Sequence, residues 1–242
     1  MEKLYTIIIL MFLLVLIIFY TNFYFGKQFY SCSDCEKNEY FYIDVKLPSQ
    51  NSINKIEKLL NKGTLINPKS NFNNAQGKKI NSLILPQNIK EFYMTDKLRQ
   101  EVSEIIGEEV YYAPESEKYR IFARIYDQPN DFLDWHYDNN FTKGNRYTLV
   151  IPISVSKGNT SEFMIKDRKT KEEIIVPIEI GKGVIYNGSE VYHKISKQTK
   201  NNKRIVIIIP FYTNYTKSLI GEIREVFRNF TYKHLELFTH FQ

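Results

Sequence analysis

The sequence predicts a mainly β protein with flanking helices (α+β), built on a double-stranded β-helix core of the jelly-roll or cupin-like kind, with one N-terminal transmembrane helix. Three observations predict this class. Short runs of β-branched and aromatic residues, separated by turn sequences, fill the chain from Tyr119 to Thr213. Apolar residues recur at helical spacing on both sides of that region, at Leu85–Ile106 and at Lys217–Phe238. The stretch Leu4–Phe25 contains no charged residue.

The uncharged stretch Leu4–Phe25 is long enough, at about 1.5 Å per residue, to cross a hydrocarbon core of about 30 Å. A cleaved signal peptide needs small residues at its cleavage site, but the first alanine of the chain is Ala75, and the aromatic residues Phe29 and Tyr30 follow the apolar stretch. We therefore interpret residues 1–26 as an uncleaved membrane anchor.

Residues 27–84 are predicted to form a juxtamembrane stalk and a small lobe in front of the core. They are rich in Asn, Lys and Ser and contain one predicted helix, Ser52–Asn61. Cys32 and Cys35 are the only two cysteines. They fit a disulfide, local or intermolecular, in an oxidising lumen and two inert thiols in the cytosol, and no second pair is present to complete a zinc site.

Residues 85–216 are predicted to form the core domain. It opens with a helix at Leu85–Ile106, which Gly107 ends. Residues 217–242 are expected to form an amphipathic helix that packs on this core. The strands predicted between the two helices are Tyr119–Tyr126, Arg146–Val155, Glu162–Lys166, Glu173–Ile180, Gly183–Asn187, Val191–Ile195 and Arg204–Thr213.

His136 and Asp138 form a His-x-Asp pair. In a strand or its exit loop, residues two apart point to the same side, so both side chains can bind one small ion. His193, on another predicted strand, would add a second imidazole. Two histidines and one carboxylate form a facial triad, which leaves three coordination positions open and suits non-haem Fe(II) oxygen chemistry. Asp138 can also begin a turn with Asn139, which is compatible with a ligand role.

Arg204 stands at the head of the most apolar strand of the chain. The run Ile205–Ile209 that follows it reads as a strand buried on both faces, so we expect the guanidinium to face an anion. An arginine suits a carboxylate because its planar fork can donate two parallel hydrogen bonds. Lys203, the preceding residue, is the alternative for this role.

The arrangement of these residues resembles the 2-oxoglutarate and Fe(II)-dependent dioxygenases, most closely their prolyl 4-hydroxylase-like branch. The resemblance covers Leu85 to Thr213, with His136, Asp138 and His193 matching the iron ligands of the family. It implies a jelly-roll core and an enzyme that hydroxylates a C–H bond while 2-oxoglutarate is converted to succinate and CO2.

The resemblance also implies the cofactors: Fe(II), 2-oxoglutarate as cosubstrate, O2, and ascorbate as reductant. Arg204 would bind the far carboxylate of 2-oxoglutarate. Tyr126 stands where some prolyl hydroxylases have a cosubstrate-binding tyrosine. Trp135 and Tyr137, on either side of the proximal histidine, would pack against or shield the metal, or else be ordinary core aromatics.

The resemblance implies a protein or peptide substrate, above all peptidyl proline or another protein side chain. A small molecule or lipid substrate is the alternative, and a catalytically inactive jelly roll that binds a partner at a membrane is a second one.

By analogy with collagen-type prolyl hydroxylases, we expect a single-pass membrane protein with its catalytic domain in the lumen of the secretory pathway. The net charge is +6, partly from basic residues between His193 and Arg204. This charge could attract phosphate, but with a membrane anchor we do not expect a nucleic-acid partner.

Overall fold

A computed structural model describes residues 40–62, 64–66, 75–158, 160–199 and 202–217, together with the isolated positions Tyr5, Phe12, Leu13, Leu219 and Glu222. The described residues from Tyr40 to Asp167 and from Glu172 to Lys217 belong to one compact unit, and the fold below is the fold of that unit. Its elements, in chain order, are β1 (Phe41–Asp44), α2 (Gln50–Asn61), β2 (Thr64–Ile66), β3 (Ala75–Ile80), α3 (Gln87–Tyr93), α4 (Asp96–Ile106), β4 (Tyr111–Tyr112), β5 (Phe122–Tyr126), β6 (Phe132–His136), β7 (Arg146–Val155), β8 (Phe163–Lys166), β9 (Glu173–Val176), β10 (Lys182–Asn187), β11 (Tyr192–Ile195) and β12 (Arg204–Tyr212).

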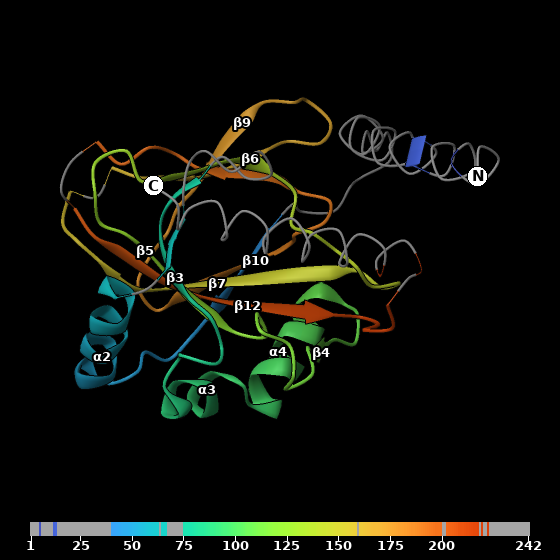
Figure 1. Ribbon diagram of the computed structural model, residues 1–242, viewed down its shortest axis with the longest axis horizontal. Coiled ribbons are helices and arrows are strands. Elements are labelled where there is room, and N and C mark those ends of the chain that lie inside the picture. The colour runs from blue at the N-terminus through green and yellow to red at the C-terminus, as the bar shows by residue number, and fades with distance from the viewer. Residues whose placement is uncertain are drawn as a thin grey trace. The chain divides into compact units, whose positions relative to one another are not determined.

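The strands form one curled antiparallel sheet (Figure 1). Their order is β1-β10-β7-β12-β5-β3-β6-β11-β8-β9. The part from β1 to β3 is called the large sheet here, and the part from β3 to β9 the small sheet. β2 pairs with β3, and β4 pairs with β12. From β5 to β12 the chain passes repeatedly between the two sheets, with β8 and β9 as a hairpin of the small sheet, so the predicted double-stranded β-helix, or jelly roll, is confirmed.

β3 belongs to both sheets because it bends at Gly77. Ala75 and Gln76 pair with β6 of the small sheet, whereas Lys78–Ile80 pair with β5 of the large sheet. Gly77 has φ +138°, and a Cβ at this position would lie 2.9 Å from the carbonyl oxygen of Ile125. Glycine is therefore the residue that lets the strand pass from one sheet to the other.

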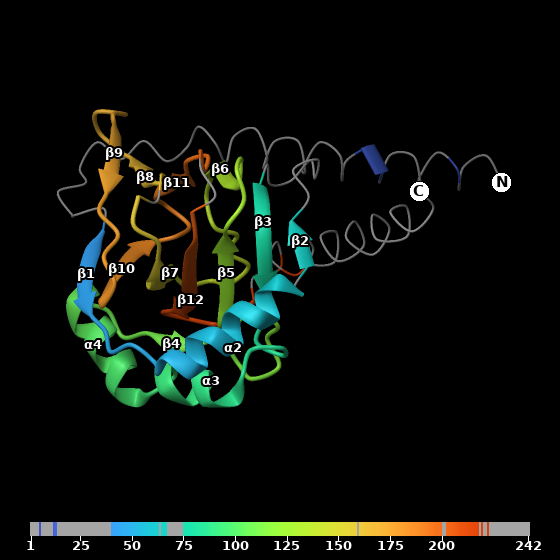
Figure 2. The ribbon, with the colours of Figure 1, turned by 90° about the vertical axis from the view of Figure 1, so that its left-hand side faces the viewer.

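The helices α2, α3 and α4 cover the outer face of the large sheet, on the side opposite to β6, β8, β9 and β11 (Figure 2). Alternate residues of the central strands, such as Ala123, Ile125 and Ile207, face these helices and form one hydrophobic core with Ile56 and Val102. All five side chains are fully buried. Because one face of each strand of the large sheet packs against the helices, the other face points into the space between the two sheets.

The second core lies between the two sheets. Tyr126 and Val206 of the large sheet and Phe163 and Ile165 of the small sheet are buried in it. Their strand neighbours of opposite parity face outward, so even-numbered residues of β5 and β12 point into the inter-sheet space. The candidate site lies in this space.

The predicted strand boundaries agree with the structure within a few residues, except that Glu173–Ile180 is shortened to β9. The predicted helix Leu85–Ile106 is two helices, α3 and α4. The chain breaks at Thr95 because its hydroxyl accepts a hydrogen bond from the backbone N–H of Leu98 and so begins a new helix. Gly107, in the left-handed conformation, ends α4 as predicted.

Two parts of the sequence prediction fall largely on residues that the structure does not describe. The predicted membrane anchor 1–26 is one, and the amphipathic helix 217–242 is the other. A search of the described residues finds no helix with the length and hydropathy of a membrane span. Residues 40–80, predicted as stalk and lobe with a single helix, contribute β1 and β3 to the sheets.

Candidate metal centre and cosubstrate site

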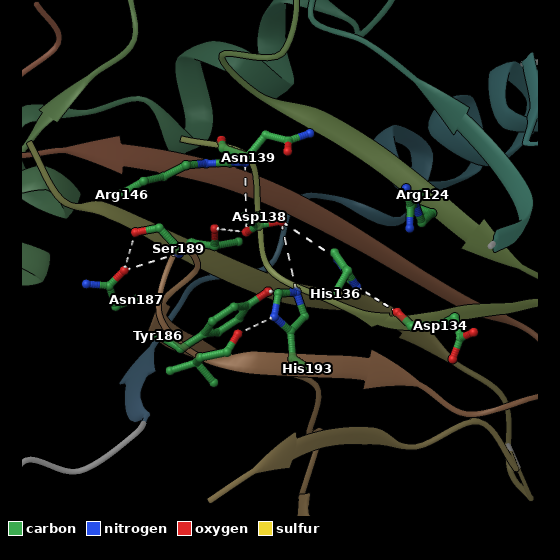
Figure 3. Close-up of polar contacts among 12 residues, drawn as sticks. Arg124, Asp134, His136, Asp138, Asn139, Arg146, Tyr186, Asn187, Ser189 and His193 are labelled. Atoms are coloured by element: carbon green, nitrogen blue, oxygen red, sulfur yellow. Dashed lines mark hydrogen bonds and ion pairs between the residues drawn. The ribbon is translucent and has the colours of Figure 1, made fainter. Parts of the chain in front are cut away.

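His136 and His193 face each other across the small sheet. They are direct partners in the antiparallel pair of β6 and β11, and their ring centroids lie 4.1 Å apart. The Oδ1 atom of Asp138 lies 3.8 Å from Nε2 of His136 and 4.0 Å from Nε2 of His193. Figure 3 shows the three side chains pointing toward one another, and their ligand atoms all lie within 4.8 Å of one another. The structure thus brings together the three residues that the sequence predicts as metal ligands.

Both imidazoles are held with Nε2 toward the centre. Nδ1 of His136 lies 2.8 Å from the carbonyl oxygen of Asp134, and Nδ1 of His193 lies 2.9 Å from that of Val191. A carbonyl oxygen can only accept, so each Nδ1 carries the proton and each Nε2 keeps its lone pair. This tautomer is the one that binds a metal through Nε2.

Three neighbours fix the carboxylate of Asp138. Its Oδ2 accepts a hydrogen bond from the hydroxyl of Thr148 at 2.5 Å and lies 3.8 Å from Nη2 of Arg146. The backbone of Gly188 lies so close that a Cβ there would be 2.7 Å from the Thr148 hydroxyl and would also collide with Oδ2 of Asp138. With Oδ2 held from behind, Oδ1 is directed at the two histidines.

Burial and charge set the protonation states. Burial lowers the pKa of His136 to about 3, and the neighbouring His193 adds to this effect. Burial also lowers the pKa of His193. Burial favours the neutral acid at Asp138, but Arg146, with smaller contributions from the histidines, outweighs it and holds the pKa below its ordinary value. At pH 7 both imidazoles are neutral and the carboxylate is ionised, as metal binding requires.

These residues fit a ferrous ion. Two neutral imidazole nitrogens and one carboxylate oxygen on one side of the ion form the facial set that leaves three positions for other ligands. Tyr186 of β10 lies beside this set, with its hydroxyl 3.2 Å from Nε2 of His193. Burial raises the pKa of Tyr186 well above its ordinary value, so the hydroxyl stays protonated and can donate a hydrogen bond to a ligand at the metal.

Arg204 is buried in the inter-sheet space, with only 1% of its surface exposed. Its Nη1 donates a hydrogen bond to the carbonyl oxygen of Ser161, but Nε and Nη2 have no hydrogen-bond partner. Tyr126 is its direct neighbour on β5, and the guanidinium carbon lies 4.9 Å from the centroid of that ring. Two unpaired donors on a buried cation fit a carboxylate ligand, so the residues also fit 2-oxoglutarate.

Lys203, the alternative to Arg204, points elsewhere. Its Nζ lies 2.7 Å from the carboxylate of Glu57 on α2. The alternation of side chains along the strand explains the difference, because adjacent residues leave opposite faces of the sheet. Arg204 is therefore the cation on the side of the metal ligands.

Trp135 and Tyr137 do not enclose the metal ligands. The Trp135 ring stacks on Tyr192 with centroids 5.3 Å apart, and Tyr137 also contacts Tyr192. Alternation places Trp135 and Tyr192 on the face of the small sheet opposite to His136 and His193. Trp135 and Tyr137, which flank His136 in the sequence, therefore pack against Tyr192 and do not shield the metal ligands.

Sequence reasoning did not identify several residues of the site: Arg124, Arg146, Thr148, Tyr186 and Gly188. Strand alternation could have found two of them, because Arg146 and Thr148 lie on the same face of β7. The others are brought to the metal ligands by pairing between strands far apart in the chain, which no local pattern encodes.

The sequence matches no protein-family model, and no curated protein sequence is similar to it. Solved structures are similar in fold. A prolyl-4-hydroxylase from Pseudomonas putida aligns with a TM-score of 0.52 and 12% identity, over 76% of this chain and 96% of that one. An oxidoreductase of the 2OG-Fe(II) oxygenase family from Burkholderia pseudomallei gives a TM-score of 0.53 and 10% identity over 75% and 88% of the two chains.

HygX from Streptomyces hygroscopicus, solved with nickel, 2-oxoglutarate and hygromycin B bound, is a third similar structure. It aligns with a TM-score of 0.51 and 8% identity, over 72% of this chain and 82% of that one. At these identities the similarity is one of fold, and what the site can do follows from its own residues.

Proposed function

Because this protein has the fold of the 2-oxoglutarate- and Fe(II)-dependent oxygenases and carries their His-x-Asp…His cluster, we propose that it is a 2-oxoglutarate- and Fe(II)-dependent dioxygenase that hydroxylates a C–H bond. The observation that carries the proposal is that two independent features lie between the same two sheets. One is the cluster of His136, Asp138 and His193, and the other is Arg204, a buried cation with unpaired donors.

Each residue has a defined task in this reaction. The task of His136, Asp138 and His193 is to hold Fe(II). The Nδ1 atoms of the two histidines are fixed by backbone carbonyl oxygens, and Oδ2 of Asp138 is fixed by the Thr148 hydroxyl. When bound together, Fe(II), 2-oxoglutarate and O2 supply oxidation of an unreactive C–H bond, with one oxygen atom going to succinate and the other to the substrate as CO2 is released. The triad fixes where that oxidation takes place, and so which substrate carbon it reaches.

Arg204 holds the far carboxylate of 2-oxoglutarate through its free N–H donors. Its burial removes competing water, which strengthens the charge-assisted hydrogen bonds. Tyr126 lines the same place, since its ring packs against the guanidinium of Arg204 and its hydroxyl accepts a hydrogen bond from Arg124. Together they set the orientation of the cosubstrate relative to the metal.

For the substrate we propose a peptidyl proline or another protein side chain, with a small molecule or lipid as the alternative. The fold similarity to a prolyl-4-hydroxylase supports the first, and the similarity to HygX with hygromycin B bound supports the second. The first is preferred because the motif resembles the prolyl 4-hydroxylase-like branch.

We also propose that residues 1–26 anchor the protein in a membrane, with the oxygenase domain in the lumen of the secretory pathway. The uncharged stretch Leu4–Phe25 supports the anchor. The proposal is tested by alkaline carbonate extraction of membranes and by protease protection of the oxygenase domain in sealed vesicles. Release of the protein by carbonate would refute the anchor, and digestion without detergent would refute the luminal orientation.

The activity is tested by measuring succinate formed by the purified full-length protein with Fe(II), ascorbate and 2-oxoglutarate under air. Proline-rich peptides and small-molecule candidates are added in turn. We expect turnover that one substrate class stimulates, that His136→Ala abolishes, and that Lys203→Met leaves intact. Folded protein that binds neither Mn(II), as a redox-inert substitute, nor 2-oxoglutarate would refute the proposal.

A further inference from the structure

Three arginines project from the inner face of the large sheet: Arg124 of β5, Arg146 of β7 and Arg204 of β12. The face follows from alternation, because Ala123 and Ile125 on either side of Arg124 belong to the core under the helices. Arg146 is paired with Asp138, and Arg204 is assigned to 2-oxoglutarate. The task of Arg124 is open.

The described residues give Arg124 no counter-charge. Its Nη1 donates a hydrogen bond to the hydroxyl of Tyr126 at 3.0 Å, but its buried Nε has no hydrogen-bond partner. No carboxylate within the described part of the chain forms an ion pair with it. Its direct neighbours across the ladders are Lys79 of β3 and Val206 of β12, neither of them an acid.

Arg124 lies in the same inter-sheet space as the residues assigned to 2-oxoglutarate. It is two residues from Tyr126 on the same face of β5, its Nη1 donates a hydrogen bond to the Tyr126 hydroxyl at 3.0 Å, and the Tyr126 ring packs against Arg204. In Figure 3 Arg124 is labelled to the right of the cluster, and no dashed line joins it to His136, Asp138 or His193. Unlike Arg204, it is only partly buried, so a molecule that enters from solvent can reach it.

The charges of the assembled site do not balance. Three arginines and a ferrous ion meet one carboxylate from the cluster, that of Asp138, and the two carboxylates of 2-oxoglutarate. A positive excess remains beside the half-buried Arg124, where an unpaired charge is less favourable than in water. The cosubstrate cannot remove this excess, because its far carboxylate is matched by Arg204 and its near carboxylate by the metal.

We propose that Arg124 binds a carboxylate of the substrate that is oxidised, so that the substrate is an acid with a carboxylate near the C–H bond attacked. The inference rests on the proposed function and names its substrate class. A guanidinium is suited to this because it offers two parallel N–H donors to one carboxylate. The carboxylate can belong to a small acid or to an acidic side chain of a peptide.

The first experiment uses acetate as the probe. The full-length protein is loaded with Mn(II) and saturated with 2-oxoglutarate, and the relaxation of the acetate methyl protons by Mn(II) is measured by NMR. We expect saturable relaxation in the wild type and an acetate affinity about ten-fold lower in Arg124→Met, as for loss of one charge-assisted hydrogen-bonded pair. Arg124→Lys should keep part of the affinity, and Lys97→Met, which removes an exposed charge on α4, should keep all of it.

The second experiment separates the two sources of the carboxylate. Succinate formation is compared for N-acetylproline and its amide, and for end-blocked Pro-Asp and Pro-Asn peptides. We expect one acid to stimulate turnover at least about ten-fold more than its amide in the wild type, and this preference to vanish in Arg124→Met. The pair that shows the preference identifies a small acid or an acidic peptide.

Several results would overturn the inference. Acetate relaxation that is equal in Arg124→Met and the wild type would do so, as would amides that stimulate as well as acids. A loss of 2-oxoglutarate affinity in Arg124→Met as large as in Arg204→Met would place Arg124 in the cosubstrate site instead. A wild type that binds neither Mn(II) nor 2-oxoglutarate is a different failure, that of the proposed function itself.

Discussion

Replacing Arg204 by methionine should separate the affinity for 2-oxoglutarate from the stability of the protein. In the free protein Nη1 of Arg204 is bonded to Ser161, while Nε and Nη2 are buried without partners. A hydrogen bond from a charged donor contributes about 1.5–3 kcal/mol, so two such bonds to a carboxylate contribute at least about 3 kcal/mol. At about 1.4 kcal/mol per factor of ten, Arg204→Met should weaken 2-oxoglutarate binding by about 100-fold or more.

The same substitution should not destabilise the metal-free protein. Replacing a buried charge by an apolar side chain of similar size is neutral or stabilises by about 1–4 kcal/mol when the charge has no good partner. Loss of the contact with the Tyr126 ring offsets about 0.5–2 kcal/mol of this. Taking the middle of each range, we expect the free energy of unfolding to rise by about 1 kcal/mol, which is a rise in Tm of about 2–4 °C for a protein of this size; the ends of the ranges span a loss of about 2 to a gain of about 3.5 kcal/mol.

The measurements are isothermal titration of 2-oxoglutarate into Mn(II)-loaded protein and thermal unfolding without metal or cosubstrate. Lys203→Met is the matched control, since it removes the neighbouring charge from the opposite face and should leave 2-oxoglutarate affinity unchanged. The reasoning is refuted if Arg204→Met binds 2-oxoglutarate as tightly as the wild type, or if the metal-free variant loses more than about 2 kcal/mol. The latter result would mean that Arg204 mainly supports the core.

Three further predictions concern the metal ligands. Gly188→Ala should lower Mn(II) affinity at least about ten-fold in a titration, because the added Cβ displaces Asp138; unchanged affinity would contradict the geometry. Thr148→Val should also lower Mn(II) affinity about ten-fold by freeing Asp138, and Thr148→Ser should restore it; equal values for Val and Ser would contradict the role of the hydroxyl. The metal-free protein should lose stability as pH falls below about 6.5, by up to about 1.4 kcal/mol per pH unit for each of His136 and His193, because the unfolded chain takes up protons that the buried imidazoles refuse. Denaturant unfolding between pH 7 and 5 measures this slope, which His136→Asn should roughly halve; a slope that is flat in the wild type would be inconsistent with these lowered pKa values.

Seven strands of the sheets, β5 and β7 to β12, could be predicted from the sequence because their signals are local. Arg146–Val155 has the bounds that its composition predicts, and Arg204–Thr213 differs from β12 by one residue. The same holds for the metal ligands, since His136 and Asp138 are two residues apart and His193 lies in a recognisable strand. For such features, spacing along the chain determines which side chains share a face.

β1 and β3 were not among the predicted strands. Phe41–Asp44 reads Phe-Tyr-Ile-Asp, and three of these residues favour strands, but it lies in the region interpreted as a stalk. Ala75–Ile80 has no strong strand composition and contains Gly77, which weakens a strand. It forms a strand because β5 and β6 offer it partners, so tertiary pairing overrides local propensity there.

By itself, the sequence determined seven of the described strands, the three residues of the metal-ligand cluster and the expectation of a cosubstrate-binding cation, Arg204 with Lys203 as the alternative. Only the tertiary structure decided that Lys203 pairs with Glu57 while Arg204 is buried between the sheets, that Thr148 and Gly188 hold the ligand carboxylate, and that Arg124 contacts Tyr126 on the same inner face. The physical reason is the range of the interactions. Alternation along a strand is fixed by backbone geometry between neighbours, whereas the charge that a side chain meets depends on strands that pair across long stretches of chain.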